Sequence, residues 1–181
     1  MKSDLPGLTL FTLVEDAALV VWLALARTNR QIFGLATLIV GFFIEHVIAF
    51  NVKSRTPLFR VAGAPVGKVF LNALLETFFV WALWLVLWDI NPLIAAVYVY
   101  PALVVEHSFT DNIFHKRPLL ENLLNKKVFG FSFLEGTGCN GWLYLVGIKQ
   151  PVIGIVVLVV FQFLEHRMAI NLGRVPDQHP A

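Results

Sequence analysis

Six long apolar stretches dominate the sequence and limit how the chain can fold. They cover residues 8–26, 32–50, 69–88, 93–109, 128–148 and 152–170. Each is close to the length of about 20 residues that an α-helix needs to cross the hydrocarbon core of a bilayer. Apolar and polar residues do not alternate within them, which argues against a transmembrane β-barrel. The sequence therefore predicts an all-α integral membrane protein, a six-helix bundle with a single transmembrane domain over residues 1–181.

The composition excludes other classes of protein. Only 14% of the residues are charged and 57% are hydrophobic, whereas a soluble domain carries about 25% charged residues. A soluble globular fold and intrinsic disorder are both excluded by these values. The single cysteine, Cys139, allows neither an intrachain disulfide nor a cysteine-based metal centre. The first residues lack the pattern of a cleavable signal peptide, so we expect the first apolar stretch to remain as a span.

A polar pattern recurs inside these apolar stretches. The second, fourth and sixth contain FFIEHVIAFN, LVVEHSFTDN and QFLEHRMAIN, so each reads Glu-His-x4-Asn, and each odd stretch carries one early glutamate. The glutamates are Glu15, Glu45, Glu76, Glu106, Glu135 and Glu165, and the histidines are His46, His107 and His166. The odd and even glutamates are 30 residues apart in all three pairs. We infer three tandem helical hairpins, over residues 8–57, 69–118 and 128–176, with pseudo-threefold symmetry along the membrane normal.

The spacing also places the glutamates in one layer. The midpoint of each 30-residue interval falls in a short turn, RTNRQ, WDINP or IKQP. The chain therefore leaves the glutamate layer in one helix and returns to the same depth in the next. Lysines and arginines are concentrated on the side of the termini and the long loops, eleven against three on the turn side. The eleven are Lys2, Lys53, Arg55, Arg60, Lys68, Lys116, Arg117, Lys126, Lys127, Arg167 and Arg174. The positive-inside rule therefore predicts cytoplasmic termini and a glutamate layer nearer the cytoplasmic surface.

Six carboxylates at one depth in a membrane need a balancing charge. Ionised groups are expensive in a low dielectric unless they are paired, and the spacing puts no lysine at that depth. Protons or metal ions must supply the positive charge, and three divalent ions would neutralise six carboxylates. Carboxylates and neutral imidazoles without thiolates suit iron, manganese or zinc. We therefore predict that all nine residues are metal ligands, with iron favoured, for two or three ions and in the fullest case a trinuclear cluster.

The pattern is similar in its logic to the ferritin-like di-iron proteins. Those proteins build their site in a helical bundle, from a Glu on two helices and a Glu-x-x-His on two others. Here the Glu and His are adjacent, there are three units, and the bundle lies in a membrane. The similarity is therefore one of ligand chemistry and does not assign the chain to that family.

Several functions are compatible with this pattern. The first is a metal-dependent membrane oxidoreductase of the oxidase, hydroxylase or desaturase type, acting on a lipid, a quinone or an isoprenoid-type molecule. The second is a metal or proton transporter. The third is a metal-free lipid isomerase that uses Glu and His as acid and base. The expected partners are membrane lipids or a hydrophobic small molecule, an electron donor or a larger membrane complex to which this chain is accessory, and no nucleic acid.

Overall fold

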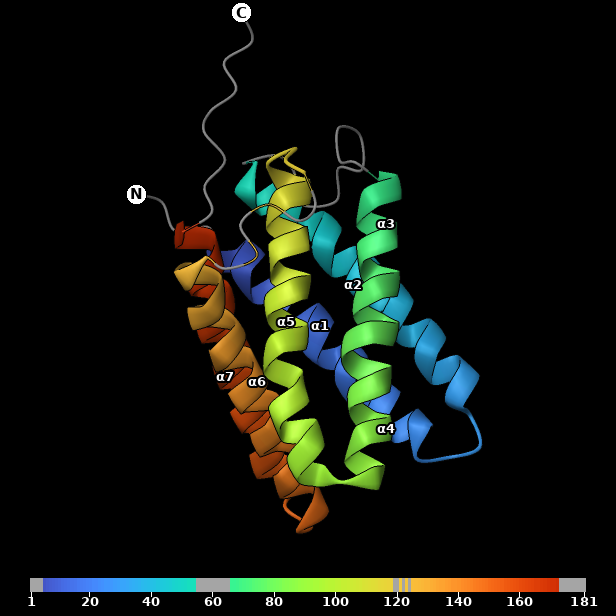
Figure 1. Cartoon of the computed structure of the whole chain (residues 1–181). Helices are drawn as coiled ribbons and strands as arrows, with labels where there is room; N and C mark the ends of the chain where they lie inside the picture. The colour runs from blue at the N-terminus through green and yellow to red at the C-terminus, as the bar shows by residue number, and fades with distance from the viewer. Residues whose placement is uncertain (1–4, 55–65, 119–120, 122, 124, 173–181) are drawn as a thin grey trace, which may run out of the picture.

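The computed structural model describes residues 5–54, 66–118, 121, 123 and 125–172, and almost all of them are helical (Figure 1). The helices are α1 (Leu5–Ala26), α2 (Gln31–Lys53), α3 (Val66–Leu75), η1 (Glu76–Ala82), α4 (Leu83–Ile90), α5 (Pro92–Phe114), α6 (Lys126–Gly147) and α7 (Pro151–Leu172). The segments α3, η1 and α4 follow one another without a break and form one rod, Val66–Ile90. The described residues thus form six helical rods, and the prediction of an all-α fold is confirmed.

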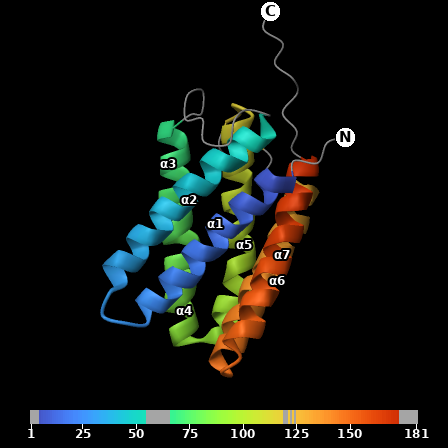
Figure 2. The same ribbon diagram turned by 180° about the vertical axis from the view of Figure 1, so that it is seen from behind.

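The six rods pack as three antiparallel hairpins. These are α1 with α2, the rod α3–η1–α4 with α5, and α6 with α7. Their turns lie at one end of the bundle, the lower end in Figure 1, and the beginning of α1 and the end of α7 lie at the opposite end. The second helix of each hairpin contacts the first helix of the next, α2 with α3, α5 with α6 and α7 with α1. These contacts close the hairpins into a ring, and Figure 2 shows α1 and α2 from the other side.

The lengths and outer surfaces of the helices are those of a membrane protein. Five rods, α1, α2, α3–η1–α4, α5 and α7, are long and apolar enough to cross a bilayer. Large apolar side chains such as Ile32, Leu93 and Val152 are exposed on the outside of the bundle, where lipid tails would cover them. Helix α6 is as long as α1, 22 residues. It is less apolar than α1, since it contains several glycines and begins with two lysines. Six spans and cytoplasmic termini remain predictions, and Lys2, Arg55, Arg60 and Arg174 lie outside the described residues.

The helices follow from local chemistry at the turns. The side chain of Asn91 caps α5 by accepting a hydrogen bond of 2.9 Å from the Leu93 N–H, as an N-cap asparagine does. Pro92 and Pro151 stand at the first positions of α5 and α7, where a missing N–H costs no helical hydrogen bond. Most rods extend a few residues beyond the apolar stretches of the sequence, because helical hydrogen bonding continues past the apolar part of each span.

One stretch of the third rod is a π-helix, η1, which begins at Glu76. The wider turn brings residues five apart over one another, and the indole Nε1 of Trp81 donates a hydrogen bond of 3.1 Å to Glu76 Oε1. The hydroxyl of Tyr98 on α5 donates to the backbone carbonyl of Phe79 within η1, so this carbonyl has a partner. Short π-helical segments are frequent at functional sites, and this one positions a predicted ligand.

Large side chains fill the half of the bundle nearest the turns. Trp22, Trp81, Trp84 and Trp142, here named the tryptophan core, are almost wholly buried there together with Leu19, Leu38 and Phe42. Trp22 and Trp142 each follow the odd glutamate of their hairpin by seven residues, in the direction of the turn. The tryptophan core therefore separates the glutamate layer from the turn end of the bundle.

The first and the third hairpin each contain the same close contact between their own two helices. A Cβ atom at Gly34 would lie 3.3 Å from the carbonyl oxygen of Trp22, and one at Gly154 would lie 3.0 Å from that of Trp142. Both glycines therefore let the two helices of a hairpin approach closely. The two contacts are 120 positions apart in the sequence, as are Glu15 and Glu135. The shared contact supports the predicted repeat, which remains a prediction, as does its threefold symmetry.

Candidate metal centre

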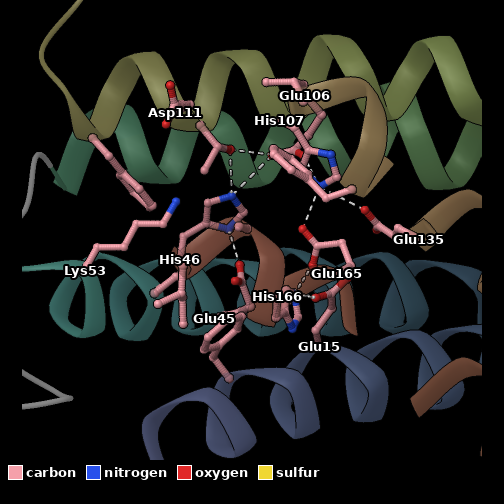
Figure 3. Close-up of a pocket in the computed structure, with 18 of the residues that line it drawn as sticks. Glu15, Glu45, His46, Lys53, Glu106, His107, Asp111, Glu135, Glu165 and His166 are labelled. Carbon is pink, nitrogen blue, oxygen red and sulfur yellow. Dashed lines mark hydrogen bonds and ion pairs between the residues drawn. The ribbon is translucent and has the colours of Figure 1, made fainter. Parts of the chain in front are cut away.

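All nine residues predicted as ligands line one cavity, of about 90 Å³. The three histidines lie among the carboxylates, as Figure 3 shows for the residues that it labels. The six glutamates are buried, as are His46 and His166. A water molecule needs about 10–15 Å³ of such space, so the cavity is large enough for several ions or waters. The structure thus brings together residues from all three hairpins.

Two groups of three predicted ligands are close enough together to hold a metal ion. The first group contains His166 of α7 and the two glutamates of the first hairpin, Glu15 and Glu45. One ligand atom from each lies within 4.8 Å of the other two. His166 Nε2 is 2.8 Å from Glu15 Oε2 and 3.1 Å from Glu165 Oε2. The histidine of the third hairpin therefore faces the carboxylates of the first, across the contact between α7 and α1.

The second group contains His46 of α2 and the two glutamates of the second hairpin, Glu76 and Glu106. Their ligand atoms also lie within 4.8 Å of one another. His46 Nε2 is 3.5 Å from Glu106 Oε1 and 3.8 Å from Glu76 Oε2. The histidine of the first hairpin thus faces the carboxylates of the second.

The three remaining predicted ligands continue the same order. His107 of the second hairpin places Nε2 at 2.9 Å from Glu135 Oε2 and 3.8 Å from Glu165 Oε1, and both glutamates belong to the third hairpin. The same nitrogen is 3.5 Å from Glu106 Oε2. In each case a histidine meets the glutamates of the next hairpin around the ring.

The other ring nitrogen of each histidine has a hydrogen-bond partner. Nδ1 lies 2.7 Å from the Phe42 carbonyl in His46, from Ser132 Oγ in His107 and from Thr12 Oγ1 in His166. The Phe42 carbonyl can only accept, and the hydroxyl of Thr12 already donates to the Leu8 carbonyl, so both require a proton on Nδ1. In His46 the same Nδ1 also lies 2.7 Å from Glu45 Oε2. In both His46 and His166 this leaves Nε2 as the nitrogen that can bind an ion, and it meets carboxylate oxygens only if a proton or a metal ion lies between them. Metal-binding histidines commonly donate their other N–H in this way.

The carboxylates are partly held by neutral groups. Gln162 Nε2 lies 2.9 Å from Glu15 Oε1 and 3.5 Å from Glu135 Oε1. By contrast, oxygens of three buried glutamates make no hydrogen bond to the described residues, namely Oε2 of Glu76, Glu135 and Glu165. Each of the three faces a histidine Nε2, at 3.8 Å for Glu76, 2.9 Å for Glu135 and 3.1 Å for Glu165. A buried carboxylate oxygen next to an imidazole nitrogen is costly unless a proton or a cation lies between them.

Two lysines line the cavity beside the predicted ligands. Lys53 stands at the end of α2 with its Nζ 4.9 Å from the centre of the Phe114 ring, and Lys127 belongs to the first turn of α6. Both line the cavity together with the glutamates, at the end of the bundle opposite the turns. The sequence had placed no lysine in the glutamate layer. The length of the lysine side chain lets its ammonium group reach inward from the end of a helix.

The sequence did not predict the residues that form hydrogen bonds with the predicted ligands. Thr12 and Ser132 each precede the odd glutamate of their hairpin by three positions, and this shared spacing is the signal that could have identified them. The corresponding residue of the second hairpin, Ala73, has no hydroxyl, and His46 bonds within its own helix. Asn72 is also missing from the prediction, although it precedes Glu76 by one helical turn.

Comparison with protein-family models, with curated proteins and with solved structures found no match to this chain. The fold and the site themselves define the class of this protein. It is a membrane helical protein with buried Glu/His groups that could hold metal ions.

Proposed function

We propose that this chain is an integral membrane metalloprotein whose centre binds two or three transition-metal ions through the nine Glu and His residues. The observation that carries the proposal is the position of the histidines. Each directs Nε2 to the glutamates of the next hairpin while Nδ1 is held by another group. In the fullest form of the proposal there are three ions, and each would be bound by one histidine together with the glutamates around it.

The charge of the cavity supports bound cations. The six buried glutamates and Asp111 line it with two lysines and three histidines, so the positive groups of the cavity would not balance seven ionised carboxylates even with all three histidines protonated. Divalent ions remove this imbalance and also occupy the carboxylate oxygens that make no hydrogen bond. The donor set of carboxylate and imidazole suits iron, and it suits manganese and zinc as well.

For the reaction, we propose oxidation of a hydrophobic molecule by such a centre. Carboxylate-rich iron and manganese sites commonly carry out dioxygen and one-electron chemistry. Apolar residues such as Phe11, Phe131 and Ile170 line the cavity beside the ligands, which fits a lipid, quinone or isoprenoid-type substrate. An electron donor or a larger membrane complex is part of this proposal, because reduction of dioxygen at such a centre needs electrons from outside it.

Transport is a weaker proposal because of the packing around the centre. The tryptophan core fills the bundle between the cavity and the turns, and its four indoles are almost wholly buried. A transported ion would need a polar path through that core. The packing therefore supports ions that stay in the protein.

Metal analysis of the purified protein tests the proposal. Protein expressed with ample iron, manganese and zinc and held in lipid nanodiscs is expected to carry two or three ions per chain. Glu106→Gln and His107→Ala should each lower this number by at least one, because each removes a ligand of the cavity. The matched controls are Glu121→Gln, which alters an exposed glutamate, and His115→Ala, which alters a histidine bonded to Asp111.

A second measurement separates the metal centre from the proposed reaction. Fewer than one ion per chain in the wild type, or an unchanged number in both cavity variants, would overturn the metal centre. If the ions bind but dioxygen is not consumed in nanodiscs that contain a quinol or unsaturated lipid, the centre stands and the oxidoreductase proposal fails.

A further inference from the structure

The three histidines differ in one neighbour, which comes from the position four residues before the odd glutamate of the next hairpin. At two of them this neighbour is a phenylalanine. The Phe11 ring centre is 4.1 Å from that of His166, and the Phe131 ring centre is 4.8 Å from that of His107. At the third the neighbour is Asn72, which contacts His46. The group around His46 therefore has a polar side chain where the other two have an aromatic ring.

The carboxamide nitrogen of Asn72 is surrounded by more acceptors than it has hydrogens. Nδ2 lies 2.7 Å from His46 Nε2, 2.9 Å from Glu106 Oε1 and 2.6 Å from Thr110 Oγ1. Thr110 donates its own proton to Glu106 Oε1, so all three atoms are acceptors toward Asn72. An amide nitrogen carries two hydrogens, and one acceptor is always left without a proton. A cation near this point would satisfy all three.

The other end of the same carboxamide has no partner. Asn72 is 2% exposed, and its Oδ1 makes no hydrogen bond to any described residue. A rotation about the last side-chain bond exchanges Oδ1 and Nδ2. The oxygen would then lie where the nitrogen lies now, next to His46 Nε2 and Glu106.

We infer that Asn72 is a metal ligand, and that its carboxamide oxygen completes the coordination of an ion held by His46, Glu76 and Glu106. This inference rests on the proposed metal centre and deepens it. The ion at His46 gains a neutral oxygen ligand that the phenylalanines cannot give to the other two sites. A divalent first-row ion with a preference for oxygen ligands is the chemical class that such a site takes. The site at His46 therefore binds its ion more tightly than an otherwise equal site without Asn72.

Cobalt(II) is a suitable probe, since its visible absorption spectrum reports ligand number and type. Wild-type protein in nanodiscs, stripped of metal and titrated with Co²⁺ against a chelator, gives the affinity of each ion. Asn72→Leu keeps the size of the side chain but removes the oxygen. It should weaken the affinity for one of the ions at least about 10- to 100-fold. That is the range seen when an outer partner of a metal site is lost, and loss of a direct ligand is at least as severe. Phe131→Leu, at the matched position of the third hairpin, should leave the affinity for the ion at His46 unchanged.

A second variant covers the case in which Asn72→Leu does not fold. Asn72→Asp retains an oxygen at the same position and adds a charge, so it should keep the full number of ions and shift the Co²⁺ spectrum. The inference is overturned if Asn72→Leu binds every ion with wild-type affinity, if it binds one ion more than the wild type, or if Asn72→Asp leaves the spectrum unchanged. A wild-type protein that binds no Co²⁺ instead overturns the proposed metal centre itself.

Discussion

The hydroxyl of Ser132 should control how strongly His107 binds an ion. It lies 2.7 Å from His107 Nδ1, and Ser132 is buried in α6. Ser132→Ala leaves Nδ1 of His107 without this hydrogen-bond partner. A buried polar group left unpaired costs about 1–3 kcal/mol. The imidazole is then free to turn, so Nε2 is no longer held toward Glu135.

The expected loss of metal affinity follows from this cost. About 1.4 kcal/mol corresponds to a tenfold change in affinity, so Ser132→Ala should weaken binding at His107 roughly 10- to 100-fold, as other losses of an outer partner do. The measurement is competition between the protein and a chelator of known affinity. Thermal unfolding followed by far-ultraviolet circular dichroism should show a lower midpoint, with a larger decrease in the metal-loaded than in the metal-free protein.

Ser108→Ala is the matched control for this prediction. Ser108 is also buried, but its hydroxyl donates 2.7 Å to the Val104 carbonyl within its own helix and does not line the cavity. Its removal leaves no donor unpaired, so metal affinity should stay at the wild-type value. If Ser132→Ala and Ser108→Ala bind metal equally well, the role assigned to the Ser132 hydroxyl is wrong.

Three other changes test the packing and the centre. Gly138→Ala should lower the free energy of unfolding by about 1–3 kcal/mol, because its Cβ would lie 2.4 Å from the Cβ of Phe161, whereas Gly147→Ala, which meets nothing within 4 Å, should not lower it in the same unfolding assay. Tyr98→Phe should lower the free energy of unfolding by about 1 kcal/mol, because it removes the hydroxyl that donates to the Phe79 carbonyl of η1, and an unchanged unfolding midpoint would contradict this. Removing the ions with a strong chelator should lower the unfolding midpoint of the wild type, since ligands of the native state stabilise it, and re-addition of metal should restore it.

Much of the fold could be predicted because the membrane requires a simple pattern. A long apolar stretch can satisfy its backbone hydrogen bonds in a bilayer by forming a helix, so the apolar stretches indicated the rods closely. That the nine predicted ligands line one cavity could be predicted for the same reason. A glutamate such as Glu106 stands out in apolar surroundings, and three equal spacings identified the set.

The residues that distinguish one site from another were harder to predict. Thr12 and Ser132 are common residues in any helix, and their role depends on which helix packs against them. That packing joins α7 to α1 and α5 to α6, contacts between hairpins that a spacing within one hairpin does not contain. Asn72 likewise acquires its role from α2, which brings His46 to it.

The π-helix could not be predicted from the residues that form it. The segment ETFFVWA has no proline or glycine to mark a change of helix type. Its wider turn is accompanied by contacts to other groups, from Trp81 to Glu76 and from Tyr98 to the Phe79 carbonyl. The first links residues within the segment, and the second needs α5 alongside.

The contact between Trp81 and Glu76 gives the protein a built-in optical reporter. The indole donates directly to a carboxylate of the proposed centre, and Trp22, Trp84 and Trp142 belong to the same core. A paramagnetic ion at that distance quenches indole emission, whereas a closed-shell ion such as zinc leaves it largely intact. The intrinsic fluorescence of the untreated protein can therefore report the arrival of iron or manganese without any label.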